Sequence, residues 1–377
     1  KGFKGEKTGD SGKDDYETTI KLIKEGGIIM KHRTLFVFIG ILIMIAVFPF
    51  LTKATAASKA KPIELKLATW NPPQIAVSKA MERWAKLIEE KSGNRVKITF
   101  YWAQALAAYP DTYRATQSGI ADIGTWVFGI MSGLHPLNEF NSLPLLGYDS
   151  MASGTKVYHE LRKKFPQLDA EFKGVKLLWS CFMPAYSFHS TGKEIRAPED
   201  VRGMKIMAGA AWTDFAKSLG FVNISKGPPD WYMSLQKGLV EAHFIHWPAA
   251  YAFKLIELFS SHTLAGGAGF GMQMQCMFMN MDAWNKLPDD IQKIIMDLQP
   301  WIQDEVIKVD TAEQERGIAQ AKEMGHKMIY LTPEEIQLWT AATAPARDKW
   351  VAEMEAKGLP GKAIFEEAKR LIIKYNK

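Results

Sequence analysis

The sequence has little of what marks several common classes of protein. Its 377 residues include only two cysteines, which is too few for a disulfide framework or a cysteine-built zinc site. We expect Cys181 and Cys276 to be buried free thiols, because free cysteine behaves as a small core hydrophobe. If the chain is exported, a disulfide between the two cysteines is the alternative.

The body of the chain also lacks an excess of positive charge. The formal charge is +6, but residues 1–61 hold 11 Lys and Arg against 6 Asp and Glu. The rest of the chain therefore holds 36 basic and 35 acidic residues. A nucleic-acid-binding surface needs a concentration of basic side chains, so we expect no nucleic-acid partner.

Recognisable catalytic signatures are missing as well. The sequence contains no G-x-S-x-G elbow, no H-E-x-x-H motif and no paired-carboxylate motif, and neither cysteine lies in a catalytic signature. We expect a protein that is not an enzyme and has no cofactor; turnover of a bound ligand would show otherwise. The sequence has no internal repeat and no low-complexity segment, and its length suffices for two domains.

The N-terminal region carries an export signal. Residues 30–57, "MKHRTLFVFIGILIMIAVFPFLTKATAA", begin with two basic residues, continue with an apolar run and end in an A-x-A pattern. This order is typical of a secretory signal peptide, so we expect cleavage near Ala56 and a periplasmic protein. The alternative is an uncleaved membrane anchor, because the apolar run approaches the length needed to span a membrane.

Residues 1–29 are polar and precede that signal. A signal peptide does not begin behind a polar leader of this length, so we interpret residues 1–29 as non-native upstream translation. Their presence in the protein isolated from its host would contradict this interpretation.

The mature chain begins with alternating strands and helices. Apolar alternation predicts strands at 63–70, 95–102 and 120–126. Between the first two, residues 76–93 have apolar side chains at helical spacing and end at a glycine. Strand–helix–strand units of this kind indicate a largely parallel sheet covered by helices.

A second set of strands and helices follows from about residue 175. It includes the strands "GVKLLWSCF", "MKIMAG" and "LVEAHFIHW", and a long strand in "FGMQMQCMFMNMDAW", before a mostly helical C-terminal third. Two α/β halves joined by strands predict a cleft between two lobes, at the carboxyl ends of strands, where ligands bind.

Five short motifs occur in an order that resembles one transport family. They are "LKLATW" before a helix, "YRATQSGIADIG", "APEDVRGMKI", "DWYMSLQKGLVEA" and "MNMDAWNKLPDDIQ". Together they resemble the periplasmic substrate-binding subunit, of DctP type, of TRAP transporters, over about residues 63–374. The resemblance implies an α/β, two-lobed periplasmic binding protein, or Venus flytrap, with crossing hinge strands and a long hinge helix.

The resemblance also implies how the chain is divided and what it does. We expect lobe I to comprise 62–187 and about 272–312, and lobe II to comprise 188–271 and about 313–377. The protein would close on a small ligand and deliver it to TRAP membrane permease subunits. Closure would be a population shift, since the ligand contacts both lobes only in the closed state.

Two positions depart from the family pattern. Relatives hold a ligand carboxylate with an arginine after "KI", where this chain has Met207, and often with a second arginine, where it has Ser187. A bidentate arginine–carboxylate pair is therefore missing at both positions.

A metal-assisted site is not expected either. The branch of the family that binds a cation places a carboxylate before a tryptophan that matches Trp247, but this chain has His246 there. His243 and His246 are three residues apart in a predicted strand and should face opposite ways. We therefore favour packing or hydrogen bonding over metal binding for this pair.

Aromatic side chains remain at the expected cleft, together with a few polar groups. Aromatic walls suit a planar or apolar ligand, or an ammonium group held by cation–π attraction. Trp102 is a further aromatic side chain near the cleft, and a core role is the alternative for each aromatic. The expected substrate-binding residues are Trp70, Asn71, Trp126, Phe128, Tyr186, Ser187, Met207, Trp212, Lys226, Asp230 and Trp247.

Two ligand hypotheses follow. The first is an organic acid with an aromatic or apolar body, anchored by Lys226 or by Arg114; the second is a neutral or cationic ligand in an aromatic box. We favour the first, because acids are what the family commonly binds. A binding protein that serves a sensor instead of a transporter is a further alternative, and we favour a monomer over a dimer.

Overall fold

The computed structural model describes residues 61–129, 131, 133–267 and 269–376, and Pro62–Lys377 form one compact unit. The predicted signal peptide, the cleavage near Ala56 and residues 1–29 lie outside the described residues. Within the described part of the chain, no helix combines the length and apolar character needed to cross a membrane.

The first of two sheets has the strand order β2-β1-β3-β10-β4. β1 pairs in parallel with β2 and β3, as the strand–helix–strand pattern predicts, whereas β10 runs antiparallel to both of its neighbours. All seven residues of β10 are buried, which is typical of a central strand with both faces covered. The strands are β1 (Ile63–Ala68), β2 (Val96–Tyr101), β3 (Ile123–Val127), β4 (Val175–Phe182) and β10 (Met274–Asn280).

The second sheet has the order β11-β9-β5-β8-β6-β7. Its centre is antiparallel, because β5 pairs with both β8 and β9 in that sense, while β6 pairs in parallel with β7 and β8. The strands are β5 (Tyr186–Ser190), β6 (Lys205–Met207), β7 (Val222–Ile224), β8 (Ala242–His246), β9 (Ser261–Leu264) and β11 (Lys327–Tyr330).

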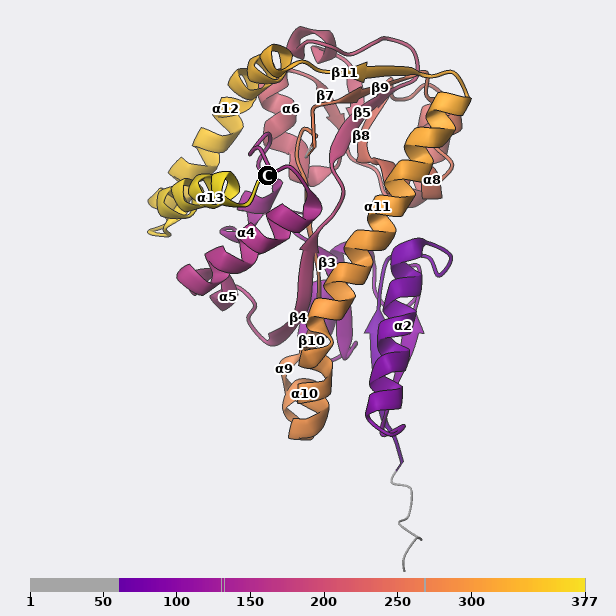
Figure 1. The fold of residues 1–377 in the computed structure, drawn as a ribbon, viewed down its shortest axis with the longest axis vertical. Helices are drawn as coiled ribbons and strands as arrows, with labels where there is room; N and C mark the ends of the chain where they lie inside the picture. Colours follow the sequence, from indigo (N-terminus) through magenta and orange to yellow (C-terminus); the bar gives the residue numbers. More distant parts are fainter. Residues whose placement is uncertain (1–60, 130, 132, 268, 377) are drawn as a thin grey trace, which may run out of the picture. The chain divides into compact units, whose positions relative to one another are not determined.

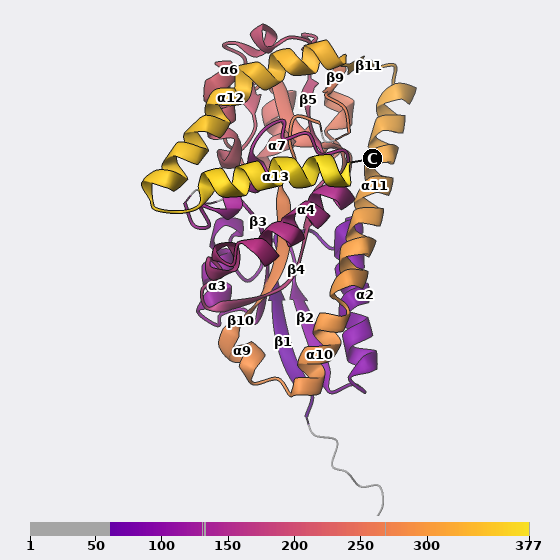
Figure 2. The same ribbon diagram turned by 60° about the vertical axis from the view of Figure 1, so that its left-hand side comes forward.

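Helices cover both sheets (Figures 1 and 2). The first, α2, buries Val77, Met81, Trp84 and Ile88 against the first sheet, in the helical spacing that the sequence shows. The helices are α2 (Ala76–Lys91), α3 (Thr112–Gln117), α4 (Met151–Lys164), α5 (Gln167–Ala170), α6 (Thr213–Leu219), α7 (Pro228–Gln236), α8 (Trp247–Ala252), α9 (Met281–Asn285), α10 (Asp289–Asp297), α11 (Gln299–Glu323), α12 (Pro333–Ala356) and α13 (Gly361–Tyr375).

Two chain segments cross between the sheets side by side. One leads from β4 to β5 and the other from β9 to β10, and they are hydrogen-bonded to each other. Met183 N donates to Gln273 O at 2.7 Å, and Tyr186 N donates to Gly271 O at 2.9 Å. These are the crossing hinge strands of the predicted two-lobed fold.

The long hinge helix of the prediction is α11. At 1.5 Å per residue its 25 residues span about 37 Å. It contacts α2 and β4 beside the first sheet and α8 beside the second, and both views show it running along the two (Figures 1 and 2).

The C-terminal helices do not follow one sheet. α12 contacts α6, but α13 packs against α4, where Ile364 and Leu371 join the same core cluster as Phe128 and Phe140. The last helix thus lies with the core of the first sheet, although the sequence prediction grouped all of 313–377 with lobe II. The reason is the apolar face of α13, which finds its partner surface on α4.

The two cysteines are free and buried, as expected. Cys181 on β4 lies in the core beside α2, whereas Cys276 on β10 lies in the core beside α4. They project from opposite faces of one sheet, so a disulfide between them is excluded in this fold.

One buried histidine makes stability depend on pH. His135 is 3% exposed, packs against the rings of Tyr113, Phe128 and Phe172, and has no partner for its Nε2 among the described residues. Burial lowers its pKa to about 4, below the value of about 6.5 for an unfolded chain. The contribution of neutral His135 to the free energy of unfolding is therefore fully present above pH 6.5 and is lost as the pH falls towards 4.

We predict that His135→Leu makes the protein less sensitive to acid. Between pH 8 and pH 5 the wild type should lose about 2 kcal/mol of unfolding free energy from this histidine, and the variant should not. Urea unfolding followed by tryptophan fluorescence measures both. Any packing cost of leucine is common to both pH values, so equal pH dependence in the two proteins would contradict the prediction.

Candidate functional site

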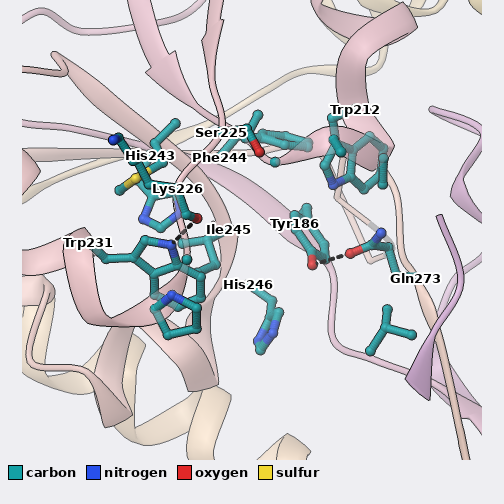
Figure 3. A pocket seen from close by; sticks show the side chains of 18 of the residues that line it. Tyr186, Trp212, Ser225, Lys226, Trp231, His243, Phe244, Ile245, His246 and Gln273 are labelled. Atoms are coloured by element: carbon teal, nitrogen blue, oxygen red, sulfur yellow. Dashed lines mark hydrogen bonds between the residues drawn. The ribbon is translucent and has the colours of Figure 1, made fainter. Parts of the chain in front are cut away.

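A pocket of about 280 Å³ lies where the two sheets face each other. Residues after the strands of the first sheet form one side of it, and β6, β8, α7 and the segment before α6 form the other. Figure 3 shows this pocket. The aromatic, charged and other polar side chains of the lining, together with two methionines, include Trp70, Tyr109, Met183, Tyr186, Met207, Trp212, Lys226, Trp231, His243, His246 and Gln273.

Aromatic rings make up much of the wall. The rings of Trp70 and Tyr109 have centroids 4.9 Å apart, and those of Tyr186 and Trp212 lie 5.0 Å apart. Trp231 meets His243 edge to face at 5.0 Å. Rings held by other rings present rigid flat surfaces, which suit a planar or apolar ligand.

A short hydrogen-bond chain orders the middle of the pocket. The Tyr186 hydroxyl donates to Gln273 Oε1, and Gln273 Nε2 donates to the Phe128 carbonyl at 3.1 Å. Burial raises the pKa of Tyr186, so the phenol stays protonated and can donate the hydrogen bond to Gln273 (Figure 3).

Lys226 supplies the charge of the pocket. Its loop is fixed by Trp231, whose Nε1 donates to the Lys226 carbonyl at 2.9 Å (Figure 3). Burial lowers the pKa of His243 and of His246 to about 3, so both are neutral at pH 7. Among the described residues that line the pocket, Lys226 is therefore the one charged side chain.

The two histidines have different surroundings. His246 ends β8 and accepts a hydrogen bond from Ala249 N at 3.3 Å, which caps α8. His243 Nδ1 has no partner among the described residues. Both line the pocket, although they are three positions apart in sequence, because His246 lies where the strand ends and a helix begins.

Five of the residues expected from the sequence come together here. Trp70, Tyr186, Met207, Trp212 and Lys226 all line the pocket. Met207, the last residue of β6, is therefore in the position from which the expected arginine would have reached a ligand.

The other expected residues lie elsewhere, and strand alternation explains several of them. Trp126 lies behind Tyr109, on the face of β3 opposite to Val127, which does line the pocket. Ser187 is buried on the face of β5 opposite to Tyr186. Phe128 belongs to the core beside α4.

Three further expectations also fall outside the pocket. Trp247 is buried against the rings of His189 and His262. Asp230 is exposed in the first turn of α7, where acidic residues complement the helix dipole. Asn71 lines a small neighbouring cavity.

Arg114 and Trp102, also considered from the sequence, lie away from the pocket. Arg114 is exposed on α3, and Trp102 stacks on Phe100 at 4.4 Å.

The sequence analysis missed Tyr109, Met183, Trp231 and Gln273. Trp231 directly follows Asp230, and its helical spacing to the buried Ser234 and Leu235 was a signal that it faces inwards. Tyr109 begins a single turn of 3-10 helix and Gln273 lies in a crossing segment, and no periodic pattern marks either of them. The described residues contain no group of His, Cys, Asp and Glu that could hold a metal ion.

Comparison with known proteins gives the family. The family of bacterial extracellular solute-binding proteins, family 7 (DctP), matches residues 67–354, and the chain belongs to it. A solute-binding protein of Chromohalobacter salexigens is 23% identical over 262 residues, covering 67% of this chain and 74% of that protein.

Solved structures agree. A TRAP periplasmic solute-binding protein from Desulfovibrio salexigens is 26% identical, with a TM-score of 0.73 over 84% of this chain and 97% of that one. A second, from Rhodoferax ferrireducens, is 24% identical, with a TM-score of 0.76 over 83% of this chain and 98% of that one. The two-lobed TRAP receptor fold expected from the motifs is thus confirmed.

The hydrogen bond from Tyr186 to Gln273 yields a prediction. Tyr186→Phe should lower the free energy of unfolding by about 1 kcal/mol, because it leaves Gln273 Oε1 without its buried donor. The matched control is Tyr232→Phe, whose hydroxyl donates to Glu257 at the surface; it should change stability by less than about 0.5 kcal/mol. Urea midpoints compare the two, and equal losses would contradict the prediction.

Proposed function

We propose that this chain is a periplasmic receptor that binds an organic acid with an aromatic or apolar body and delivers it to a TRAP permease. The observation that carries the proposal is the composition of the pocket. A single cation, Lys226, stands among aromatic and apolar side chains, and no carboxylate lines this pocket among the described residues. A cationic ligand would meet a like charge and no counter-charge there.

Lys226 lines the pocket but is exposed to solvent. The neighbouring histidines are neutral and add no second charge beside it. A carboxylate at Lys226 would form a charge-assisted hydrogen bond, while the ring or apolar body of the ligand lies against Trp70, Trp212 or Trp231.

Relatives support this ligand class. The Rhodoferax ferrireducens structure holds benzoate, and one from Bordetella bronchiseptica holds mandelate. A marine metagenome protein, described as specific for aromatic acids, holds metahydroxyphenylacetate and is 23% identical, with a TM-score of 0.77. Other relatives hold sugar acids, such as the one from Sulfitobacter with galacturonate at 19% identity.

Delivery to a permease requires closure of the lobes. A ligand that touches both sides of the pocket stabilises the closed state over the open one. We take 62–187 with about 272–312 as one lobe and 188–271 with the chain from about 313 as the other, with α13 resting on the first. That the receptor acts as a monomer is part of the same proposal.

Benzoate and benzylamine test the charge preference, because they share a ring and differ in the sign of one substituent. We expect calorimetry to show binding of benzoate but not of benzylamine. Lys226→Met should weaken benzoate at least tenfold through loss of the charge pair.

Arg114→Ala is the matched control, because it removes a cation outside the pocket; its benzoate affinity should equal that of the wild type. Tighter binding of benzylamine, or unchanged affinity in Lys226→Met, would overturn the acid proposal. Native mass spectrometry of the mature protein adds a second readout. A co-purified amine would likewise contradict the acid proposal.

A further inference from the structure

A second, smaller cavity opens beside the main pocket. Its volume is about 40 Å³, enough for about three non-hydrogen atoms, since a water needs roughly 10–15 Å³ on this measure. Trp70, Met183 and His246 line both cavities. The shared residues place the two cavities side by side, and we call the smaller one the side cavity.

The side cavity presents a buried carboxyl group. Asp310, from the middle of α11, is 7% exposed and lines it. Asp310 Oδ2 accepts a hydrogen bond from Gln275 Nε2 at 3.2 Å, and no described group donates to Oδ1. Glu313, which also lines the side cavity, has a counter-charge, because Arg316 pairs with it at 2.7 Å. No cation in the described part of the chain pairs with Asp310.

A second acceptor lies in the same lining. Asn71, after the end of β1, is 4% exposed. Its side-chain oxygen receives no hydrogen bond from any described group. A buried acceptor without a donor costs stability, so the oxygen of Asn71, beside a carboxyl with one bonded oxygen, calls for an explanation.

Burial without a cation also acts on the protonation of Asp310. It raises the pKa of this carboxyl to about 7, against the opposing effect of the Gln275 hydrogen bond. Replacing such a group by an apolar residue would remove a cost, so its presence at the edge of a binding pocket points to a role in binding.

We propose that the side cavity is a second subsite, which receives a hydrogen-bond-donating group of the ligand at Asp310 and Asn71. The inference rests on the proposed function and deepens it. The ligand is then bifunctional, with an acid group at Lys226 and a hydroxyl or ammonium group in the side cavity. Both donor groups fit the volume and the two acceptors, and the experiment separates them.

Matched acids provide the test. The probes are benzoate, 3-hydroxybenzoate, 4-hydroxybenzoate and 4-(aminomethyl)benzoate, titrated by calorimetry. We expect at least one substituted acid to bind the wild type about tenfold more tightly than benzoate, the gain of one hydrogen bond to a charged group. A gain confined to 4-(aminomethyl)benzoate identifies an ammonium group, and a gain for a hydroxybenzoate identifies a hydroxyl.

Asp310→Asn should abolish that gain and leave the affinity for benzoate unchanged. Asparagine still accepts from Gln275, so thermal unfolding should match the wild type. Asp304→Asn is the matched control, an exposed aspartate on the same helix, and should keep the full gain. Asn71→Ala serves as a second variant and should reduce the gain about threefold or more, through loss of the other acceptor.

The outcomes separate the two proposals. If benzoate binds but no substituted acid binds more tightly, or if Asp310→Asn retains the gain, the side cavity is no subsite and the acid receptor still stands. If no acid binds the wild type, the proposed function fails and the subsite fails with it.

Discussion

The site depends on the hydrogen bonding of the two segments that cross between the sheets. Phe270 N donates to the Tyr186 carbonyl at 3.1 Å, and Tyr186 N donates to the Gly271 carbonyl at 2.9 Å. The close approach needs glycine on one side: a Cβ at Gly269 would lie 2.4 Å from Tyr186 O, and one at Gly271 would lie 2.7 Å from the Trp212 ring. This pairing joins the two sheets, and Tyr186 and Gln273 of the paired segments line the pocket.

The electrostatics of the pocket follow from its burial. Removing imidazole rings from water disfavours their charged form, so His243 and His246 supply polarity without charge. Met207 lines the pocket where the family resemblance predicts an arginine, and in the proposed function Lys226 supplies the cation from another loop. A flexible ammonium makes a less directional contact than a guanidinium fork, so shape and aromatic contact carry more of the selectivity.

The hinge helix joins the proposed binding chemistry to the fold. Asp310 lies at the middle of α11, which contacts helices beside both sheets. In the proposed subsite, a ligand would touch the element that spans the lobes as well as the lobes themselves. Its binding would then bias closure directly, because ligand contacts would differ between the open and closed states.

Sequence by itself determined the two-lobed class and many of the strands and helices, but not β5, β7 or β9 of the second sheet. Periodicity located α2 and the strands of the first sheet, because burial on one face leaves a local pattern. Ordered motifs identified the family; Met207 was found because it directly follows one of them, and Lys226 because it lies in the loop before another. Which member of a neighbouring pair faces the ligand was not determined in this way: Tyr186 lines the pocket and Ser187 does not, Val127 does and Trp126 does not.

Only the tertiary structure decided those pairs, since strand alternation gives two faces but not which of them meets the cleft. It also placed Gln273, Tyr109 and Asp310 at the site, although residues 109 and 310 are far apart in sequence. Such residues come together through long-range pairing of strands and packing of α11, and these contacts leave no periodic trace in the chain.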